Sequence, residues 1–362
     1  MAIVLITVTG TVGAGGSAAG NAPPAQTATE CSFPVTKTDA TGTEVTVETE
    51  PTRIVTLSPS AAQTVWEIGG RDKVVGVTQY ANYLDGAASR ANVSGAGESF
   101  VNVERVVDLD PDLVLAPNTI SNDTVDRLRA SGLTVFSFGF QTTIEDVEEK
   151  TRLTGRLIGE CEGAAETVAW MESELDTVDE AIAGQERPRV LYVFFGYTAG
   201  EGTFAHTVIE AAGGRNVAAA ANVSGYRQIS PEVVVRSDPQ WIVVNDGATQ
   251  IPQTAAYNGT TAVERDQVVV LREEYISQPA PRIVHSVVTL AKALHPEAYE
   301  RAANGTATTG TTTPTPTSSP TATAASTTDA AATTDTSTPG FGAGVALLAL
   351  AVPLWLLGRR DD

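Results

Sequence analysis

The feature that most constrains the fold is a segment that the chain contains twice. Residues 103–116 read VERVVDLDPDLVLA, and residues 231–244 read PEVVVRSDPQWIVV. Each copy has a Glu (Glu104 or Glu232) before a Val-rich run, then an Asp-Pro pair, then an apolar run. This order predicts a short helix, a turn and a strand in each copy. A chain that repeats such a step is expected to contain two similar folding units.

Other segments repeat in the same order, which makes duplication a better explanation than chance. A strand-like run opens each half, a Gly-Gly pair follows the first helical run, and one tetrapeptide recurs letter for letter. The pairs are RIVTL (53–57) with RVLYVF (189–194), Gly-Gly at 69–70 and 213–214, and NVSG at 92–95 and 222–225.

Strand-like and helix-like segments alternate within both halves. The predicted strands are 53–57, 73–77, 113–116, 133–138, 189–194 and 268–271, and the predicted helices include 60–68, 103–109, 122–130, 205–212 and 281–294. Such alternation is typical of parallel sheets covered by helices. We therefore predict an α/β fold of two Rossmann-like lobes with central parallel sheets: lobe one (residues 31–158) and lobe two (187–302).

A long helix is predicted to bridge the two lobes, within residues 159–186. Thr142 and Glu145 are spaced as a capping box that opens a first helix, and Gly159-Glu160-Cys161 marks a break. After the break, residues 168, 171, 175, 178 and 182 form one apolar helical stripe. A helix over 162–183 would be about 33 Å long, enough to pass from one lobe to the other.

The charge balance excludes some partners. The chain has 43 acidic and 23 basic residues and a formal net charge of −20. Nucleic acid and anionic membranes would repel such a protein. Excess carboxylate with scarce lysine also suggests adaptation to high salt, as in haloarchaea, where counterions screen the repulsion.

The N-terminal region indicates export. Residues 1–28 are apolar and then rich in small residues, as in a signal peptide. In an oxidising compartment the two cysteines, Cys31 and Cys161, are expected to form a disulfide, the alternative being two buried thiols. Five N-x-[ST] sequons give modest support for a glycosylated surface protein: Asn92, Asn122, Asn222, Asn258 and Asn304.

The C-terminal region indicates attachment to the cell surface. Residues 303–338 are mostly Thr, Ala, Pro and Ser, which predicts an extended stalk. Residues 339–362 hold Pro-Gly-Phe, an apolar run over 341–357 and Arg359-Arg360. This order resembles the tripartite sorting signal of archaeal surface proteins, from which an archaeosortase removes the helix and attaches a lipid. The alternative is a plain membrane anchor; both place the folded part outside the cell.

Residues that follow the predicted strands are rich in aromatic rings and amides. Ligands of parallel sheets bind beyond the carboxyl ends of the strands, and two facing lobes would form one cleft. This composition suits a large, flat, partly apolar ligand. The predicted ligand-binding residues at these positions are Ser60, Tyr80, Tyr83, Tyr197, Tyr226, Asp246 and Tyr275.

Several of these segments together resemble a known family. RIVTLSPSAAQTVWEIGG, KVVGVTQYANY, VNVERVVDLDPDLVLA and QPAPRIVHSVVTLAKAL are similar to the substrate-binding proteins of ABC importers for cobalamin and iron–siderophore complexes. The likeness covers residues 51–294. It implies two lobes that move little, a monomer, and an ABC permease with its ATPase as partners.

The resemblance also assigns individual residues. Tyr80 takes the place of an aromatic that lines the cleft, and Tyr226 falls where the family has a Trp. Glu104 and Glu232 fall on the two carboxylates that dock onto permease arginines. The chain departs from the pattern near residues 97–98, where no Trp occurs, and at Gln278, which stands where the bacterial cobalamin binder has an Arg. Gln278 is the eighth residue predicted to bind ligand. Cobalamin is the first expectation for the ligand, and an iron–siderophore or haem complex is the alternative.

Other classes fit the sequence less well. The three histidines do not form a metal-binding pattern, so no metal or other cofactor is expected. The chain lacks the G-x-S-x-G, H-E-x-x-H and P-loop motifs, so no catalytic residue is predicted. A structural surface-layer role would explain the stalk but not the aromatic loops.

Overall fold

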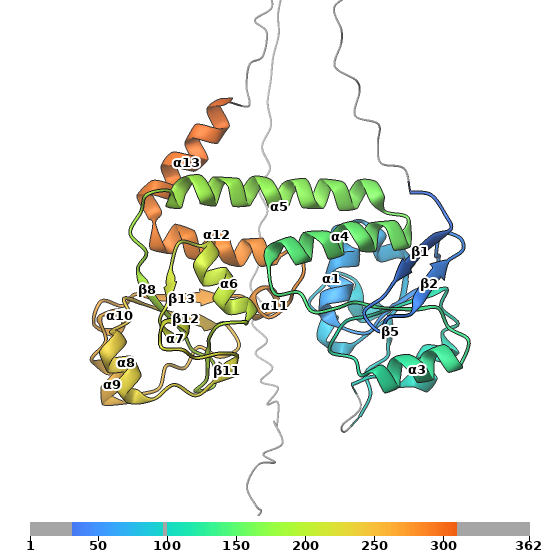
Figure 1. Ribbon diagram of the computed structural model, residues 1–362, viewed down its shortest axis with the longest axis horizontal. Helices are drawn as coiled ribbons and strands as arrows, with labels where there is room; N and C mark the ends of the chain where they lie inside the picture. Colours follow the sequence, from blue (N-terminus) through green and yellow to red (C-terminus); the bar gives the residue numbers. More distant parts are fainter. Residues whose placement is uncertain (1–30, 97–99, 310–362) are drawn as a thin grey trace, which may run out of the picture. The chain divides into compact units, whose positions relative to one another are not determined.

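The computed structural model describes residues 31–96 and 100–309, and its structural statements concern these residues. The predicted signal peptide, residues 97–98, the stalk beyond residue 309 and the predicted sorting signal lie outside them. Within the described part, parallel sheets and helices form two lobes, with lobe one on the right of Figure 1 and lobe two on the left. The predicted α/β class with a bridging helix is confirmed.

Lobe one is built on a five-stranded parallel sheet in the order β5-β4-β3-β6-β7. The strands are β3 (Ile54–Thr56), β4 (Val74–Val77), β5 (Ala91–Asn92), β6 (Leu113–Ala116) and β7 (Val135–Ser137). All four side chains of β6 are fully buried, as expected for a central strand covered on both faces. Its helices are α1 (Pro59–Glu67), α2 (Val103–Asp108), α3 (Asn122–Ala130) and α4 (Ile144–Ile158), with short 3-10 turns η1 (Gly70–Lys73), η2 (Gln79–Ala81) and η3 (Ala87–Ser89).

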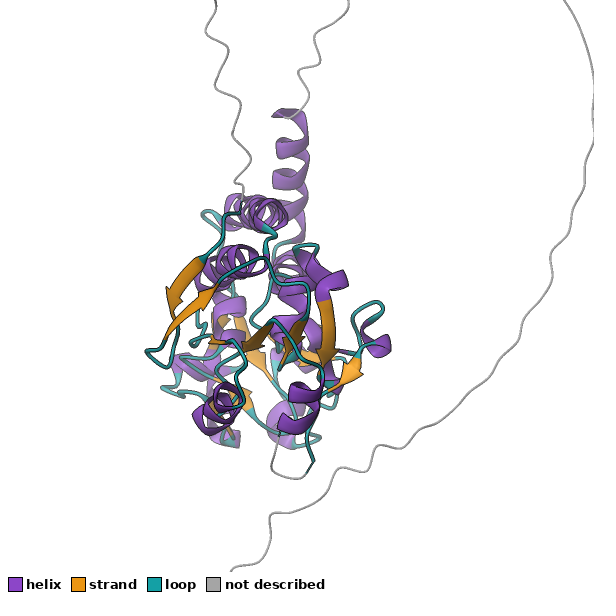
Figure 2. Ribbon diagram, turned by 90° about the vertical axis from the view of Figure 1, so that its right-hand side faces the viewer, coloured by secondary structure: helices purple, strands orange, loops and turns teal. Residues whose placement is uncertain are grey.

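Lobe two repeats this plan with a four-stranded parallel sheet in the order β10-β8-β12-β13. Its strands are β8 (Arg189–Tyr192), β10 (Arg215–Asn216), β12 (Trp241–Asn245) and β13 (Val268–Leu271). Its helices are α6 (Phe204–Ala211), α7 (Val217–Ala220), α8 (Pro231–Ser237), α9 (Ala255–Asn258), α10 (Thr261–Glu264), α11 (Glu273–Ile276), α12 (Ile283–Leu294) and α13 (Pro296–Thr309). Seen from the side of lobe one, helices lie on either side of the strands (Figure 2).

Two small antiparallel pairs were not predicted. The strands β1 (Val35–Thr38) and β2 (Glu44–Val47) form a hairpin beside lobe one, and β9 (Thr198–Ala199) pairs with β11 (Tyr226–Arg227) in lobe two. Most of these runs are too short for a reliable period-two pattern, so the sequence gives little signal for them.

The duplication extends to individual hydrogen bonds. Arg53, which precedes β3, donates from its guanidinium to the carbonyls of Leu109 and Asp110 at the end of α2. In lobe two, Arg189 at the start of β8 donates in the same way to the carbonyls of Ser237 and Asp238, at 2.8 Å each, at the end of α8. In both lobes an arginine therefore satisfies the last carbonyls of the repeated helix.

The strand that follows each repeated helix is fastened alike. The amide N–H of Arg53 donates to the Asp112 carboxylate at 2.9 Å, and that of Arg189 donates to the side-chain oxygen of Gln240 at 3.0 Å. The backbone bond in the other direction, from residue 112 or 240 to the arginine carbonyl, is 2.8 Å in both lobes. The repeat thus fixes the same junction of helix, turn and strand twice.

The helix α5 (Cys161–Ile182) bridges the lobes and extends over both of them in Figure 1. Gly159, with φ +83°, ends α4 and allows the chain to turn directly into α5. Gly163 lies against the backbone of α1, where a Cβ would come within 2.1 Å of the Ile68 carbonyl oxygen. The side chains of the predicted apolar stripe on α5 face the core. Val168, Met171 and Val178 are buried, and Leu175 and Ile182 are partly buried against the core of lobe two.

The predicted capping box is displaced by one residue. The pair is Thr143 with Asp146, not Thr142 with Glu145: the Thr143 hydroxyl accepts from the Asp146 N–H, and the Asp146 carboxylate accepts from the Thr143 N–H. Thr142 also donates to the Asp146 carboxylate. These donors lower the pKa of Asp146, with the largest effect coming from the Thr142 N–H, and together they outweigh the opposing effect of burial.

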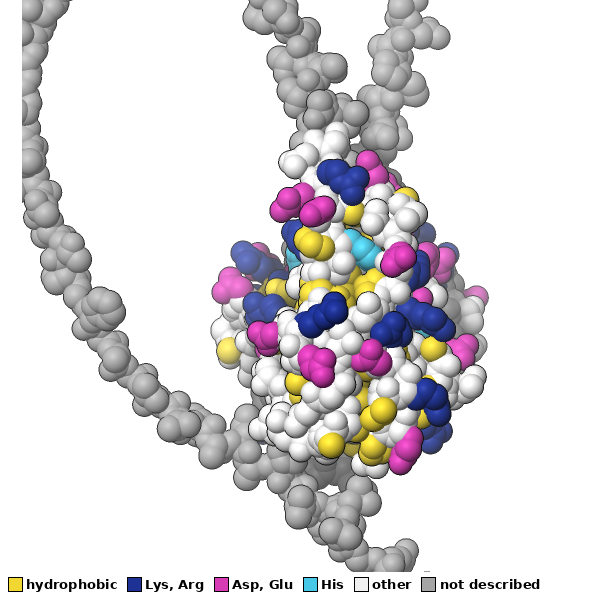
Figure 3. Space-filling model, turned by 90° about the vertical axis from the view of Figure 1, so that its left-hand side faces the viewer, with side chains coloured by type: hydrophobic (Ala, Val, Ile, Leu, Met, Phe, Trp, Pro, Cys, Tyr) yellow, Lys and Arg dark blue, Asp and Glu magenta, His cyan; other side chains and the backbone are white. Residues whose placement is uncertain are grey.

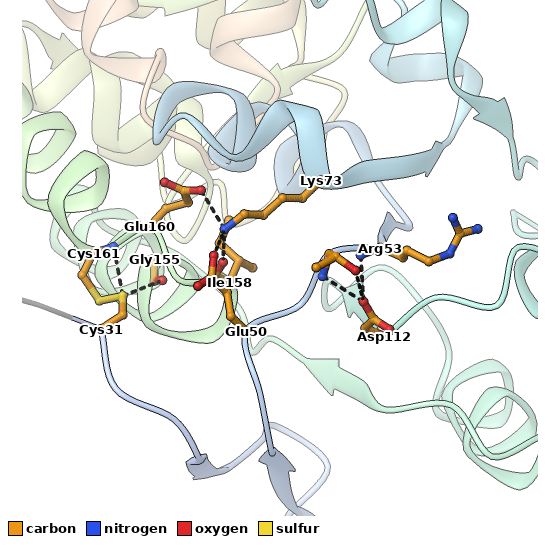
Figure 4. A network of polar contacts seen from close by, with 10 residues as sticks. Cys31, Glu50, Arg53, Lys73, Asp112, Gly155, Ile158, Glu160 and Cys161 are labelled. Carbon is orange, nitrogen blue, oxygen red and sulfur yellow. Dashed lines mark hydrogen bonds and ion pairs between the residues drawn. A yellow bond between two sulfur atoms is a disulfide. The ribbon is translucent and has the colours of Figure 1, made fainter.

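The break between α4 and α5 is held by polar contacts and a disulfide (Figure 4). Cys31 and Cys161 are joined, so the N-terminal segment is tied to the first turn of α5. Lys73 donates to the Glu50 carboxylate and the Ile158 carbonyl, both at 2.7 Å, and lies 2.8 Å from the Glu160 carboxylate. One ammonium group thereby links the segment after β2, the end of α4 and the break itself.

The end of lobe two differs from the prediction. The sequence suggests that the last helix ends at residue 294 and that an extended stalk begins at residue 303, but α13 continues to Thr309. Ala298, Tyr299 and Ala302 of α13 are buried, so burial on α5 and α12 stabilises a helix in a segment whose composition resembles the stalk.

Candidate ligand-binding site

Exposed aromatic side chains gather after the strands of both lobes. In lobe one, Tyr80 follows β4 and is 62% exposed, and Phe140 follows β7. In lobe two, Tyr197 follows β8 and is 42% exposed, while Tyr226 lies on β11 and is 52% exposed. Exposed rings at the carboxyl ends of parallel strands are the arrangement expected of a site for a flat apolar ligand.

Phe194 organises the aromatic side chains of lobe two. Its ring centroid lies 5.4 Å from that of Tyr226, 6.0 Å from Tyr197, 5.5 Å from the buried Tyr192 and 6.4 Å from Phe195. Tyr226 meets it edge to face, a favourable geometry. Tyr197 and Tyr226 were predicted from the sequence, but Phe194 was not, because it reads as the last residue of a strand.

A buried glutamine joins the two lobes. Gln63 of α1 donates to the Tyr83 hydroxyl at 2.8 Å and to the Glu274 carbonyl at 3.2 Å, and accepts from the Arg282 N–H at 3.0 Å. Arg282 also forms a 2.7 Å ion pair with Glu67. These contacts fasten the segment from α11 to α12 onto α1, so the junction between the lobes is specific.

Tyr83 and Gln278, both predicted to bind ligand, lie at or near this junction. Burial raises the pKa of Tyr83 to about 12, against a smaller opposing effect of the Gln63 hydrogen bond, so its hydroxyl stays neutral. Gln278 is half-buried and donates its backbone N–H to the Tyr275 carbonyl. Their contact with a ligand remains a prediction.

Tyr275 is part of a stack that leads from the strand ends to the bridging helix. The Arg272 guanidinium lies 5.0 Å from its ring centroid on one side, and the His285 ring is 5.5 Å away. His285 in turn lies 5.0 Å from Trp170 of α5. Burial lowers the pKa of His285, so this ring is neutral at pH 7.

The two remaining predicted residues have different surroundings. Ser60 is buried in the first turn of α1, with its hydroxyl 3.0 Å from that of Ser58. Asp246 is exposed after β12, and its carboxylate accepts the N–H of Glu273 at 2.8 Å, which connects the loops after β12 and β13.

Two cavities lie at the strand ends. One, of about 420 Å³, lies in lobe two between Phe195-Gly196 and the loop 247–253. The other, of about 580 Å³, lies in lobe one beside residues 136–141 and α4. Neither is lined by the eight residues predicted to bind ligand, although Gly196 and Gly247 of the first cavity are next in the chain to Tyr197 and Asp246. The cleft between the lobes remains a prediction.

Comparison with known proteins identifies the family. The sequence profile of the periplasmic binding proteins matches residues 54–275, most of both lobes and the whole bridging helix. The chain belongs to this family. Its members are substrate-binding proteins of ABC transporters rather than enzymes: they bind small ligands outside the cytoplasm and work with a permease and its ATPase.

Individual relatives of this periplasmic binding protein cover most of its length. It is 48% identical over 310 residues to a cobalamin-binding protein of Halobacterium salinarum, covering 82% of this chain and 84% of the relative. It is 30% identical to an uncharacterised ABC transporter substrate-binding lipoprotein of Bacillus subtilis, covering 74% and 88%. In structure it matches a periplasmic haem-binding protein of Roseiflexus with a TM-score of 0.61 and 24% identity, covering 68% and 98%.

The two carboxylates predicted to dock the permease of this periplasmic binding protein occupy equivalent positions. Glu104 and Glu232 are each the second residue of their helix, and both are exposed. The helices begin with the N-caps Asn102 and Ser230, whose side chains accept backbone N–H groups. The Glu232 backbone N–H and the Ser230 hydroxyl lower the pKa of Glu232, which keeps it ionised. The docking role is not tested by this geometry.

The three histidines of the periplasmic binding protein lie apart. His206 is near Asn216, His295 is 3.2 Å from the Gly213 carbonyl, and His285 is in the stack described above. Within residues 31–96 and 100–309, no group of three or more side chains is arranged to hold a metal ion. No helix in that part of the chain is long and apolar enough to cross a membrane.

Proposed function

We propose that the protein captures cobalamin outside the cell, between its two lobes, and delivers it to an ABC permease. The observation that carries this proposal is the 48% identity with the cobalamin-binding protein of Halobacterium salinarum, which extends over 82% of the chain. Exposed tyrosines after the strands of both lobes, Tyr80, Tyr197 and Tyr226, supply the ring surfaces that a corrin macrocycle needs.

The junction around Gln63 supports a rigid mode of capture. Its hydrogen bonds with Glu274 and Arg282 and the Arg282–Glu67 ion pair would all have to break if the lobes rotated apart. The bridging helix α5 makes large swings less favourable still. A preformed site loses little conformational entropy when it binds a rigid ligand, which favours high affinity.

Titration of the full-length chain in molar salt tests the ligand. We expect cyanocobalamin to bind with a dissociation constant at or below about 1 µM, measured by calorimetry or by quenching of tryptophan fluorescence. Haem and a ferric siderophore are the comparison ligands. Tighter binding of either one by the unaltered protein would establish the alternative, an iron-chelate carrier, and binding of none of the three would contradict both.

The ends of the chain suggest how the protein is positioned. We propose that residues 1–28 direct export and that residues 339–362 carry an archaeosortase signal at the end of a Thr/Pro-rich stalk. Their composition and order support this proposal. The folded part would then be held as a glycosylated monomer at the outer face of a haloarchaeal membrane. Mass spectrometry of the mature protein would show a chain lacking both ends and carrying a lipid.

A further inference from the structure

A strained turn in lobe two presents an aromatic ring. Phe194 and Tyr197 exchange two backbone hydrogen bonds, of 3.0 and 2.8 Å, around the pair Phe195-Gly196. Both central residues have positive φ, +45° for Phe195 and +79° for Gly196. A two-residue turn of this kind favours Asn-Gly, because positive φ is unfavourable for a bulky side chain. The chain therefore carries Phe195 at an energetic cost.

Packing within the protein does not compensate for this cost. The Phe195 side chain is 72% exposed, and its ring contact in the described structure is an edge approach to Phe194. A residue held in a strained conformation without internal burial points to a function. The turn follows β8, at the same end of the sheet as Tyr226.

Phe195 forms one wall of the 420 Å³ cavity, and the loop after β12 forms the rest. None of the residues that line this cavity, all of them described, is charged. The wall combines apolar side chains, Ala248, Ile251 and Pro252, with the amides of Gln250 and Gln253. Such a lining suits a neutral, flat group that carries a few hydrogen-bonding heteroatoms.

The start of this loop is anchored by hydrogen bonds. The Ala248 N–H donates to the Asn245 carbonyl at 2.9 Å, and Asp246 accepts from Glu273. Gly247 lies close to the Glu273 carboxylate, which a Cβ at this position would displace. The cavity is linked to the exposed tyrosines through Phe194, which contacts Phe195, Tyr197 and Tyr226.

We propose that Phe195 and this cavity bind a neutral heteroaromatic base that the ligand carries outside its macrocycle, and that Phe195 selects for ligands that have it. The inference rests on the proposed function, since cobalamin is a macrocycle with such an appended base. The tyrosines would hold the macrocycle and Phe195 would stack on the base.

The test compares cyanocobalamin with dicyanocobinamide, the corrinoid that lacks the base and its nucleotide. Phe195→Asn removes the ring but suits the turn, so the variant is expected to melt at or above the wild-type temperature. Its affinity for cyanocobalamin should fall about tenfold, while its affinity for dicyanocobinamide changes less than about twofold. Tyr226→Ala should weaken both corrinoids, and Val235→Asn, an exposed position on α8, should weaken neither.

Each outcome decides a separate question. Equal loss of both corrinoids in Phe195→Asn, or no loss of either, overturns the inference while the proposed function stands. A variant that melts well below the wild type shows that Phe195 is structural, and this also overturns it. If the unaltered protein binds neither corrinoid, the proposed function fails and the inference fails with it.

Discussion

Asp39 shows how a single carboxylate can hold an edge of lobe one. Its side chain is fully buried and pairs with Arg129 of α3. It also accepts the N–H and hydroxyl of Thr41, at 2.9 and 2.7 Å, and the N–H of Ser137 at 2.9 Å. Burial alone would raise the pKa of Asp39, but the hydrogen bonds from Thr41, Ser137 and Arg129 lower it. The β1–β2 hairpin is thereby fixed to β7.

We predict that Asp39→Ala lowers the free energy of unfolding by about 3 kcal/mol, because Arg129 loses its buried partner. Since the folded pKa is lowered, this contribution is present above the unfolded value of about 3.9 and is lost as pH falls through the folded pKa. Urea unfolding at pH 7 and pH 3 should therefore show the gap between variant and wild type shrinking at pH 3. A constant gap would contradict the ionised pairing. Asp72→Ala, at an exposed carboxylate, should change stability by less than about 0.5 kcal/mol.

At the scale of residues, sequence patterns predicted where the turns lie better than they predicted backbone angles and contacts between distant residues. The Asp-Pro pairs were expected to be turns, and Asp110 and Asp238 both adopt positive φ, +44° and +39°. Gln63 and Phe195 gave no signal, because one polar residue in an apolar helix and one ring after a strand are both common. Their importance depends on partners distant in the sequence, or on a backbone angle that composition does not encode.

At the scale of elements, α4 contributes to both lobes. Ile144 and Val147 in its first turns belong to the core of lobe two. Further along, Lys150 is buried, donates to the Pro279 carbonyl at 2.9 Å and lies 5.9 Å from the Phe138 ring centroid. Burial lowers the pKa of Lys150 to about 7. The helix thus holds the Lys150 side chain in a buried position where its charged form is poorly solvated.

This burial gives the protein a pH dependence. The folded pKa of Lys150 is below the unfolded value of about 10.4, so the unfolded state binds the extra proton between pH 7 and 10 and stability rises with pH. We predict that the free energy of unfolding of the wild type rises, relative to that of the Lys150→Met variant, by up to about 1.4 kcal/mol for each pH unit above pH 7. Urea unfolding at pH 7 and pH 9 measures this difference. Lys37→Met, at an exposed position, is the control, and a parallel response of both variants would refute the prediction.

Sequence patterns located the elements that have a clear apolar run or cap and missed the four-residue helices. The strands of 113–116 and 268–271 and the helix of 122–130 have the predicted bounds, because each has a clear apolar pattern or cap. The helices α7, α9, α10 and α11 have four residues each, which is too short for a helical period. α13 was missed because its helix is stabilised by the burial of Ala298, Tyr299 and Ala302, a tertiary effect that local composition does not encode.

At the scale of the molecule, duplication was the most informative property of the sequence. A repeated helix–turn–strand step predicts two lobes, and parallel sheets place the loops that follow their strands at one edge of each lobe. On the outer face of lobe two, acidic and basic side chains are interspersed (Figure 3). At this face, recognition of a permease would therefore depend on particular residues rather than on a patch of one sign.

The repeat presents two such residues, Glu104 and Glu232, one at the start of each equivalent helix. We predict that Glu104→Arg with Glu232→Arg abolishes cobalamin uptake by cells and leaves the affinity of the purified protein for cyanocobalamin unchanged. The substituted arginines would then face the arginines expected on the permease and repel them. The affinity should not change, because none of the tyrosines predicted to bind ligand is altered. Each single variant should retain part of the uptake, since one carboxylate still docks.

A matched pair separates docking from general loss of negative charge. Asp108 lies on the same helix as Glu104 but at its other end, and Glu264 is an exposed carboxylate on α10. Asp108→Arg with Glu264→Arg changes the net charge equally, so uptake should stay near the wild-type level. Equal loss of uptake in both pairs would show that net charge matters rather than position. Loss of ligand affinity in the Glu104 and Glu232 pair would instead place these carboxylates in the ligand site.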